Sequence, residues 1–223
     1  MILEIFKTED GSDSLFNPIL NEVYHSKHGA INESNHVFIK AGLEYVSDCF
    51  KTINILEIGF GTGLNVLLTL DYCHSKNTRI RFYTLEPFPI KSEVYSNLNY
   101  HKFCKLPDSR LLFNNIHQSS WNQEIWLNDN FLFYKSKKGI EEEQFSSNRF
   151  NLVYFDAFAM DIQPELWSKQ VFEKIYHSME EKGVLVTYAA KGQVRRNLKD
   201  AGFSVERIPG PKGKREMLRA TKK

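Results

Sequence analysis

Short apolar runs alternate with amphipathic segments through most of the chain. Runs of apolar and β-branched residues predict strands at 53–60, 79–87, 131–134, 151–155 and 183–189. Apolar positions on one side predict helices at 34–50, 64–74, 92–101, 165–179 and 193–201. Strands that alternate with helices predict an α/β fold with a doubly wound, mostly parallel sheet. Two strands around the Pro/Gly turn near residue 211 close the sequence, so we expect a C-terminal antiparallel strand.

The whole chain, 1–223, is predicted to form one domain, because its length suits a single core. Residues 1–35 have turn formers and no clear period, and we expect an irregular N-terminal extension over the site. The segment 107–130 has two tryptophans in polar sequence, and it is predicted to be an insertion lying over the sheet.

Composition narrows the class of protein. With 42% hydrophobic and 25% charged residues the chain reads as soluble and globular. No apolar run reaches the roughly 20 residues of a membrane helix, and the first residues lack the basic start of a signal peptide. The three cysteines are far apart and form no CxxC pair, and His25 and His28 lack further ligands. We therefore expect a cytoplasmic protein with no membrane partner, no disulfide framework and no metal site.

The net charge of +2 conceals an asymmetry along the chain. From residue 191 to 223 there are 11 Lys and Arg against 3 Asp and Glu, whereas the rest carries 18 basic and 24 acidic residues. A basic segment on an otherwise acidic protein favours a polyanionic partner. Ordinary surface charge on a terminal helix and hairpin explains the same count.

The sequence ILEIGFGTGLN (55–65) puts three glycines between a predicted strand and a predicted helix. Glycine allows positive φ and close approach of a ligand, and the helix start offers free N–H groups. The spacing is GxGxG, and Leu64 stands where the dinucleotide pattern GxGxxG continues. With the acid Glu57 before the glycines, this motif resembles motif I of class I S-adenosylmethionine-dependent methyltransferases, which are Rossmann-like. A plain strand–helix turn is the alternative.

Two more acids end predicted strands. Glu86 follows Gly63 by 23 residues, the place where nucleotide-binding βαβ units put an acid for ribose hydroxyls. Asp156 ends the fourth strand of the expected sheet, directly before Ala157 and Phe158. Since ligands bind outside the carboxyl ends of parallel strands, we expect Glu57, Glu86 and Asp156 to converge on one edge. Asp156 is alternatively a cap of its own loop.

Longer stretches carry a more specific resemblance. FDAFAMDIQPELW (155–167), the segment 183–221 with GKREML, and LNEVYHSKHGAINESNHVFI (20–39) closely resemble the methyltransferase of the MnmC family. The resemblance covers about residues 21–221. It implies N-methylation of 5-aminomethyl-2-thiouridine to 5-methylaminomethyl-2-thiouridine at the tRNA wobble position, with S-adenosyl-L-methionine as cofactor.

The resemblance also implies roles for individual residues. Asp156 would hold the amine and take or relay its proton, and Phe158 would wall the pocket or stack on the uracil. Tyr24 and Glu33 would close the site. Predicted cofactor contacts are Glu57, Gly59, Phe60, Gly61, Gly63, Glu86 and Asp156, and predicted contacts to the phosphates of the anticodon stem-loop are Arg195, Arg196, Lys212, Lys214 and Arg215, with Lys191 beside them.

Two departures from the family are visible. Larger members fuse this domain to an FAD-dependent oxidoreductase; here we expect methyl transfer alone, with a separate FAD-dependent oxidoreductase as a candidate partner. Family members usually carry an acid after the strand that corresponds to 131–134, where it meets the adenine amino group. This chain reads KSKKGIEEE (135–143), and its nearest acid is Glu141. Either Glu141 or the backbone contacts the adenine, or cofactor affinity is reduced.

Three other functions fit parts of the pattern. A class I methyltransferase for a small-molecule or protein amine needs no basic face. A nicotinamide-dependent oxidoreductase is disfavoured by Leu64. A non-catalytic tRNA-binding module would tolerate the missing adenine acid. Cofactor titration and tRNA binding separate the three.

Overall fold

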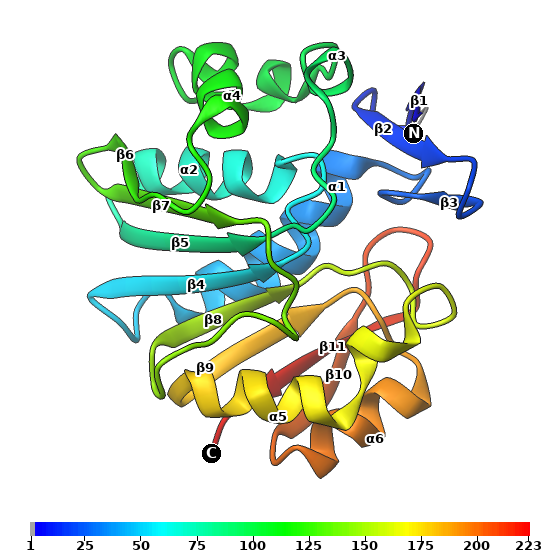
Figure 1. Cartoon of the computed structure of the whole chain (residues 1–223), viewed down its shortest axis with the longest axis vertical. Helices are drawn as coiled ribbons and strands as arrows, with labels where there is room; N and C mark the ends of the chain where they lie inside the picture. The colour runs from blue at the N-terminus through cyan, green and yellow to red at the C-terminus, as the bar shows by residue number, and fades with distance from the viewer. Residues whose placement is uncertain (1–2) are drawn as a thin grey trace.

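The computed structural model describes residues 3–223. Its centre is an eight-stranded sheet with the order β10-β11-β9-β8-β4-β5-β7-β6 (Figure 1). The strands are β4 (Thr52–Ile58), β5 (Arg79–Leu85), β6 (Ile125–Asn128), β7 (Phe131–Ser136), β8 (Phe150–Phe155), β9 (Met179–Thr187), β10 (Ser204–Pro209) and β11 (Glu216–Thr221).

Strands β4, β5, β7, β8 and β9 are parallel, whereas β11 is antiparallel to both β9 and β10. Alternate residues of β4 and β8 enter separate cores on the two sides of the sheet: Ile55 and Leu152 on one, Leu56 and Val153 on the other. A parallel strand buried on both faces needs a continuous apolar run, and β8 is buried along its whole length. The predicted fold class is confirmed.

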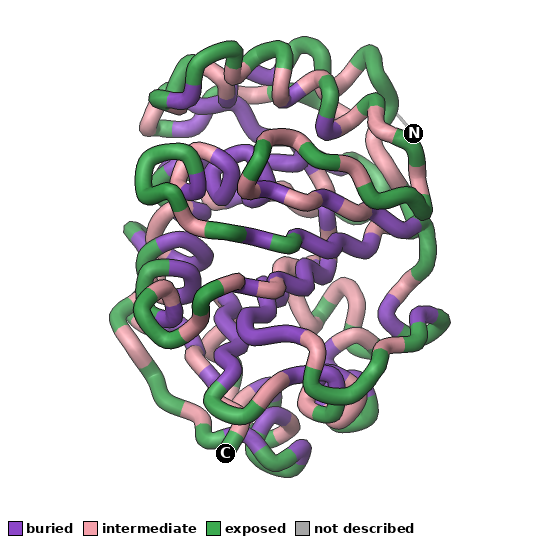
Figure 2. The backbone as a smooth tube through the Cα atoms, turned by 90° about the vertical axis from the view of Figure 1, so that its left-hand side faces the viewer, coloured by how far each residue is buried: buried purple, intermediate pink, exposed green. Residues whose placement is uncertain are grey.

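Helices cover both faces of the sheet (Figure 1). One core takes apolar side chains from α2 (Leu64–Lys76), α4 (Ser109–Gln118) and the π-helix η1 (Asn35–Glu44), which continues α1 (Ala30–Ser34). The other takes them from α5 (Lys169–Ser178) and α6 (Gly192–Asp200). Figure 2 shows the buried backbone concentrated between these layers. The short elements are α3 (Ser92–Tyr95), η2 (Tyr100–Phe103) and η3 (Pro164–Trp167).

The N-terminal region is more regular than the sequence predicts. Residues 4–23 form an antiparallel sheet of β1 (Glu4–Lys7), β2 (Asp13–Asn17) and β3 (Glu22–Val23). The expectation of an irregular extension is wrong there. Strands of two to five residues are too short for a recognisable period, and β2 is formed mostly of buried polar residues.

The segment 107–130 also differs from the expectation. Its first part is α4, which packs beside α2, and its last part is β6, which pairs antiparallel with β7 at the edge of the sheet. Part of the segment therefore extends the sheet instead of lying over it. The reason is tertiary: only pairing with β7 makes a strand of the four residues of β6.

Two negative observations apply to residues 3–223. None of the helices in this range has the length and apolar character needed to cross a membrane. In the same range, no three His, Cys, Asp or Glu side chains are grouped as metal ligands.

Candidate active site

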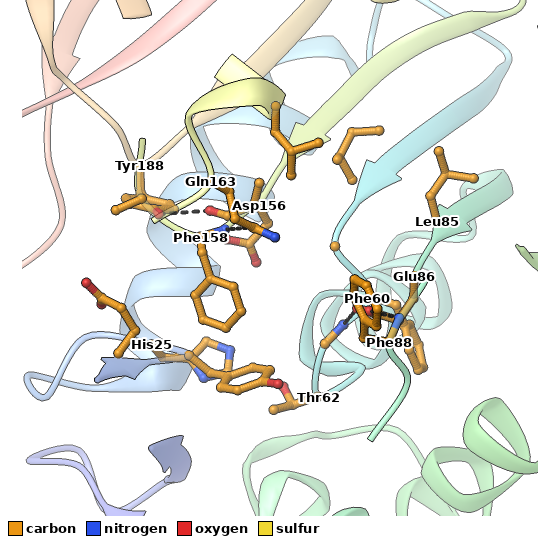
Figure 3. Close-up of a pocket in the computed structure, with 18 of the residues that line it drawn as sticks. His25, Phe60, Thr62, Leu85, Glu86, Phe88, Asp156, Phe158, Gln163 and Tyr188 are labelled. Carbon is orange, nitrogen blue, oxygen red and sulfur yellow. Dashed lines mark hydrogen bonds between the residues drawn. The ribbon is translucent and has the colours of Figure 1, made fainter. Parts of the chain in front are cut away.

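A cavity of about 620 Å³ lies at the carboxyl ends of the parallel strands. It is lined by the loops that follow β4, β5, β7, β8 and β9, and by residues 17–26 of the N-terminal region. In Figure 3, Asp156, Phe158, Gln163 and Tyr188 lie on one side of it, and Phe60, Leu85, Glu86 and Phe88 lie on the other. This is the edge of an open α/β sheet where ligands bind.

The glycine loop after β4 has the backbone that its sequence predicts. Gly59, Gly61 and Gly63 have φ values of 95°, 50° and 75°. A Cβ on Gly59 would lie 2.6 Å from the carbonyl oxygen of Asp156, so glycine is required by space as well as by φ. Gly63 caps the start of α2. Gly59, Phe60 and Gly61 line the cavity, whereas Gly63 is not part of the lining.

Glu86 ties the loop after β5 to the glycine loop. Its carboxylate accepts hydrogen bonds from the backbone N–H of Gly61 and of Phe88, each at 2.9 Å. Burial raises the pKa of Glu86, and the two N–H donors oppose this effect. Phe88 is 75% exposed at the cavity. Sequence reasoning missed Phe88, although an aromatic residue two positions after a strand-end acid was a usable signal.

Asp156 stands at the end of β8, with its carboxylate facing α2. The Asn65 side-chain amide donates a hydrogen bond to Asp156 Oδ2 at 2.8 Å. Burial, with Glu33 nearby, raises the pKa of Asp156 to about 7, while the Asn65 bond and Lys214 oppose the shift. The side-chain hydrogen bond of Asp156 is thus made with α2 and not with its own loop. Asn65 was missed from the sequence because a helix-start asparagine has many ordinary roles.

Aromatic side chains wall the cavity beside Asp156. The rings of Tyr24 and Phe158 meet edge to face, with centroids 5.1 Å apart. Tyr188 donates its hydroxyl hydrogen to the Ala157 carbonyl at 2.9 Å, and Trp167 Nε1 donates to the Phe158 carbonyl at 2.8 Å. The Phe158 backbone is therefore fixed from two sides, which presents its ring to the cavity (Figure 3).

An ion pair between a half-buried lysine and a buried glutamate lines the cavity near Asp156. Lys214, in the turn between β10 and β11, is 2.8 Å from Glu33 and 3.9 Å from the centre of the Tyr188 ring. Glu33 also accepts the backbone N–H of Ser26 at 2.7 Å. Figure 1 shows this C-terminal turn beside the N-terminal sheet. Residues nearly two hundred positions apart therefore meet at the cavity.

The structure places the predicted basic residues unequally. Lys214 lines the cavity, and Lys212 pairs with Glu9 at 2.9 Å on the surface. Arg196 is exposed on α6 and donates to Gln193, and Arg215 is exposed in the C-terminal turn. Arg195 is half-buried. The two lysines thus already have acidic partners, and the exposed guanidinium groups remain at the surface.

Glu57 lies near Glu86 and Asp156, as the sequence predicts, but it does not reach the cavity with them. It is fully buried in β4 and is not part of the cavity lining, whereas Glu86 and Asp156 are. Its Oε2 accepts the Thr84 hydroxyl at 2.6 Å. The side chains of a strand alternate between the two faces of the sheet, and Glu57 points into the layer under α2. Gly139, Ile140 and Glu141, which follow β7, also line the cavity.

Comparisons with known proteins agree with this geometry. A family described as S-adenosyl-L-methionine-dependent methyltransferase has a model that matches residues 111–223. The tRNA 5-methylaminomethyl-2-thiouridine biosynthesis bifunctional protein MnmC of Campylobacter hominis is 29% identical over 216 residues, which cover 92% of this chain and 31% of the relative. The protein of that name from Leptospira interrogans is 30% identical over 211 residues, with 89% and 32% covered. The chain spans about a third of the length of these relatives.

Solved structures agree with the sequence comparisons. The crystal structure of MNMC2 from Aquifex aeolicus matches 100% of this chain and 71% of that chain, with a TM-score of 0.79 and 27% identity. A spermidine synthase from Thermotoga maritima, 12% identical with a TM-score of 0.50, shares the fold.

Proposed function

The chain belongs to the family of S-adenosyl-L-methionine-dependent methyltransferases, and we propose that it methylates the primary amine of 5-aminomethyl-2-thiouridine at the wobble position of tRNA. The observation that carries the proposal is Asp156, an acid in a cavity whose other side has the glycine loop and Glu86. The names of the relatives support the choice of tRNA as substrate. We propose that the reaction takes place in the cytoplasm.

The cavity residues fit the cofactor. S-adenosylmethionine supplies an electrophilic methyl group on a sulfonium. Glu86 lines the cavity, and it would accept the two ribose hydroxyls in fork geometry with the lone pairs that its two backbone hydrogen bonds leave free. Phe88 and Ile140 would enclose the adenine, and Glu141 is the acid available to its amino group. The glycine loop leaves the backbone open to close approach.

Asp156 suits a substrate that is a cation and must become neutral before it reacts. An alkylamine has a pKa near 10, so it arrives as an ammonium ion. Proton transfer to an ordinary aspartate would be uphill by roughly 6 pKa units, or about 8 kcal/mol. The pKa of Asp156 is raised to about 7, which leaves roughly 3 units, or about 4 kcal/mol. Asp156 would therefore hold the ammonium, take or relay its proton, and leave the nitrogen lone pair free to attack.

The walls beside Asp156 suit a nucleobase. Phe158 and Tyr24 form an apolar corner with one ring edge against the other face, and unstacked bases bind well to aromatic side chains. The wobble base would leave its stack to reach the cavity. A flavin-dependent oxidoreductase is the class of enzyme that would supply the aminomethyl group.

Methyl transfer tests the proposal directly. We expect labelled methyl groups to pass from S-adenosylmethionine to tRNA purified from cells that lack this activity. Fully modified tRNA is the matched control, since its nitrogen is already methylated. A protein that binds the cofactor and methylates a free amine or a protein, but not the undermethylated tRNA, would overturn the choice of substrate.

Charge reversal tests the phosphate contacts. Because phosphate binding releases counterions, the paired change Arg195→Glu and Arg196→Glu should weaken tRNA binding and reduce its salt dependence. The matched control is the paired change Lys76→Glu and Arg79→Glu. Both residues are exposed near the start of β5, at the edge of the sheet away from the cavity. Cofactor affinity should be unchanged in both variants. Equal loss of tRNA binding in the two variants would argue for general charge instead of a defined surface.

A further inference from the structure

Glu57 is a buried acid that the proposed mechanism does not use. Its side chain is wholly inaccessible, and one carboxylate oxygen, Oε1, has no hydrogen-bond partner within residues 3–223. The other oxygen accepts the Thr84 hydroxyl. A buried carboxylate with an unpaired oxygen is costly, so this group requires an explanation.

The neighbouring amide of Asn65 has the complementary defect. Its Nδ2 donates to Asp156 Oδ2 at 2.8 Å, which fixes the direction of the amide. Its Oδ1 is buried and, like Glu57 Oε1, lacks a donor among the described residues. The Asn65 side chain lies within hydrogen-bond reach of Glu57, and by itself this contact lowers the pKa of Glu57. Two unpaired acceptors on neighbouring side chains lack one hydrogen atom between them.

We propose that Glu57 is a protonated acid whose hydrogen is donated to Asn65, and that this contact orients the amide which holds the Asp156 carboxylate toward the substrate. The proposal rests on the proposed function only for the role of Asp156. Glu57 is then a positioning residue: it acts through Asn65 and touches no reacting atom. The hydrogen on Oε1 gives both unpaired oxygens a partner.

The electrostatic surroundings agree with a neutral Glu57. Burial raises its pKa well above the ordinary value, and Asp156 and Glu86 add to the effect, which outweighs the opposing contributions of Thr84 and Asn65. Asp156 in turn is influenced by Glu33 and Lys214. Two tyrosines also face these acids: Glu57 helps to raise the pKa of Tyr154, and Asp156 helps to raise the pKa of Tyr188.

The arrangement explains how two acids can share one layer without both being charged. Like charges in a low dielectric disfavour each other, so one of the two stays protonated. Glu57 is the more deeply buried and keeps the proton, whereas Asp156 meets the cavity and stays available as an acceptor. An acid in motif position before the glycines would otherwise be expected to contact the cofactor as an anion.

Spectroscopy tests the protonation without any substrate. At about pH 9, roughly two units above the pKa of Asp156, the infrared spectrum should retain the carbonyl band of a protonated carboxylic acid. The band should disappear in Glu57→Gln and persist in Asp156→Asn. In the unaltered protein labelled with carbon-13 glutamate, one carboxyl carbon should keep its protonated chemical shift at this pH. Absence of both signals in the unaltered protein would overturn the proposal.

The pH profile of methylation tests the positioning role. Asn65→Leu removes a hydrogen bond that lowers the pKa of Asp156, so the acidic limb of the profile should move to higher pH by about one unit. Glu57→Gln, which keeps a neutral donor, should restore the limb that Glu57→Leu displaces. If the rate falls in Asn65→Leu and Glu57→Leu but the acidic limb of the pH profile does not move, the role of Glu57 is merely structural and the proposal is overturned. Missing tRNA methylation together with a persistent acid band would count against the proposed function alone.

Discussion

Replacing Asp156 by asparagine is expected to stabilise the protein near neutral pH while it removes most of the methyl transfer. The folded-state pKa of Asp156 is about 7, against an ordinary value of 3.8. The folded state therefore binds the proton more tightly than the unfolded state does. Ionising Asp156 in the folded state therefore lowers the free energy of unfolding. This loss of stability is absent below the unfolded pKa, grows as the pH rises between the two pKa values, and is complete above the folded pKa.

The magnitude follows from this shift. About 3 units correspond to at most about 4 kcal/mol. Asp156 is partly exposed at the cavity and is screened by solvent and Lys214, so we expect about 1–2 kcal/mol of stabilisation in Asp156→Asn at about pH 8. For a chain of this size that is roughly 2–8 °C in melting temperature. Asparagine can still accept the hydrogen bond from Asn65, so the packing should survive.

Activity should move in the opposite direction. Without a charge to hold the ammonium or a base to take its proton, single-turnover methylation should fall by about 10²-fold or more. The matched control is Asp161→Asn in the same loop, an exposed acid paired with Lys191, which should change neither quantity much. Thermal melting at about pH 4 and pH 8 and single-turnover rates would be measured on the same samples. A melting temperature that drops at pH 8, or turnover close to the unaltered rate, would refute the reasoning.

Three further changes test other parts of the site. Glu86→Ala should weaken S-adenosylmethionine binding by about 1–3 kcal/mol, since charge-assisted bonds are lost, and calorimetry should show no binding of nicotinamide dinucleotide in either protein. Lys214→Gln leaves the buried Glu33 unpaired and should cost about 1–2 kcal/mol of stability in urea unfolding; adding Glu33→Gln should recover most of it, and additive losses would contradict the pairing. Gly59→Ala puts a Cβ 2.6 Å from the Asp156 carbonyl, so a soluble variant with normal cofactor affinity would disprove the close packing.

The alternation of strands and helices was readable from the sequence because it depends on local pattern. A parallel strand such as β8 is buried along its whole length and mostly apolar, and α2 follows glycines that permit positive φ. The same logic placed Glu86 and Asp156 at strand ends on one edge of the sheet, and both line the cavity. The N-terminal strands and β6 were not readable, since their few residues are too short to show a period and become strands only through pairing with the neighbouring strand.

The chemical state of the site was decided by tertiary structure alone. Glu57 and Asp156 both stand at the ends of apolar runs, and no pattern in the sequence separates a buried acid from one that meets the cavity. Lys214 and Glu33 are 181 positions apart, yet the turn between β10 and β11 brings them within 2.8 Å beside Asp156. Sequence by itself determined the fold class and the edge where chemistry occurs, because both follow from local periodicity and chain direction. Burial and long-range pairing determined which acids carry charge, because desolvation and neighbouring charges exist only once the chain is packed.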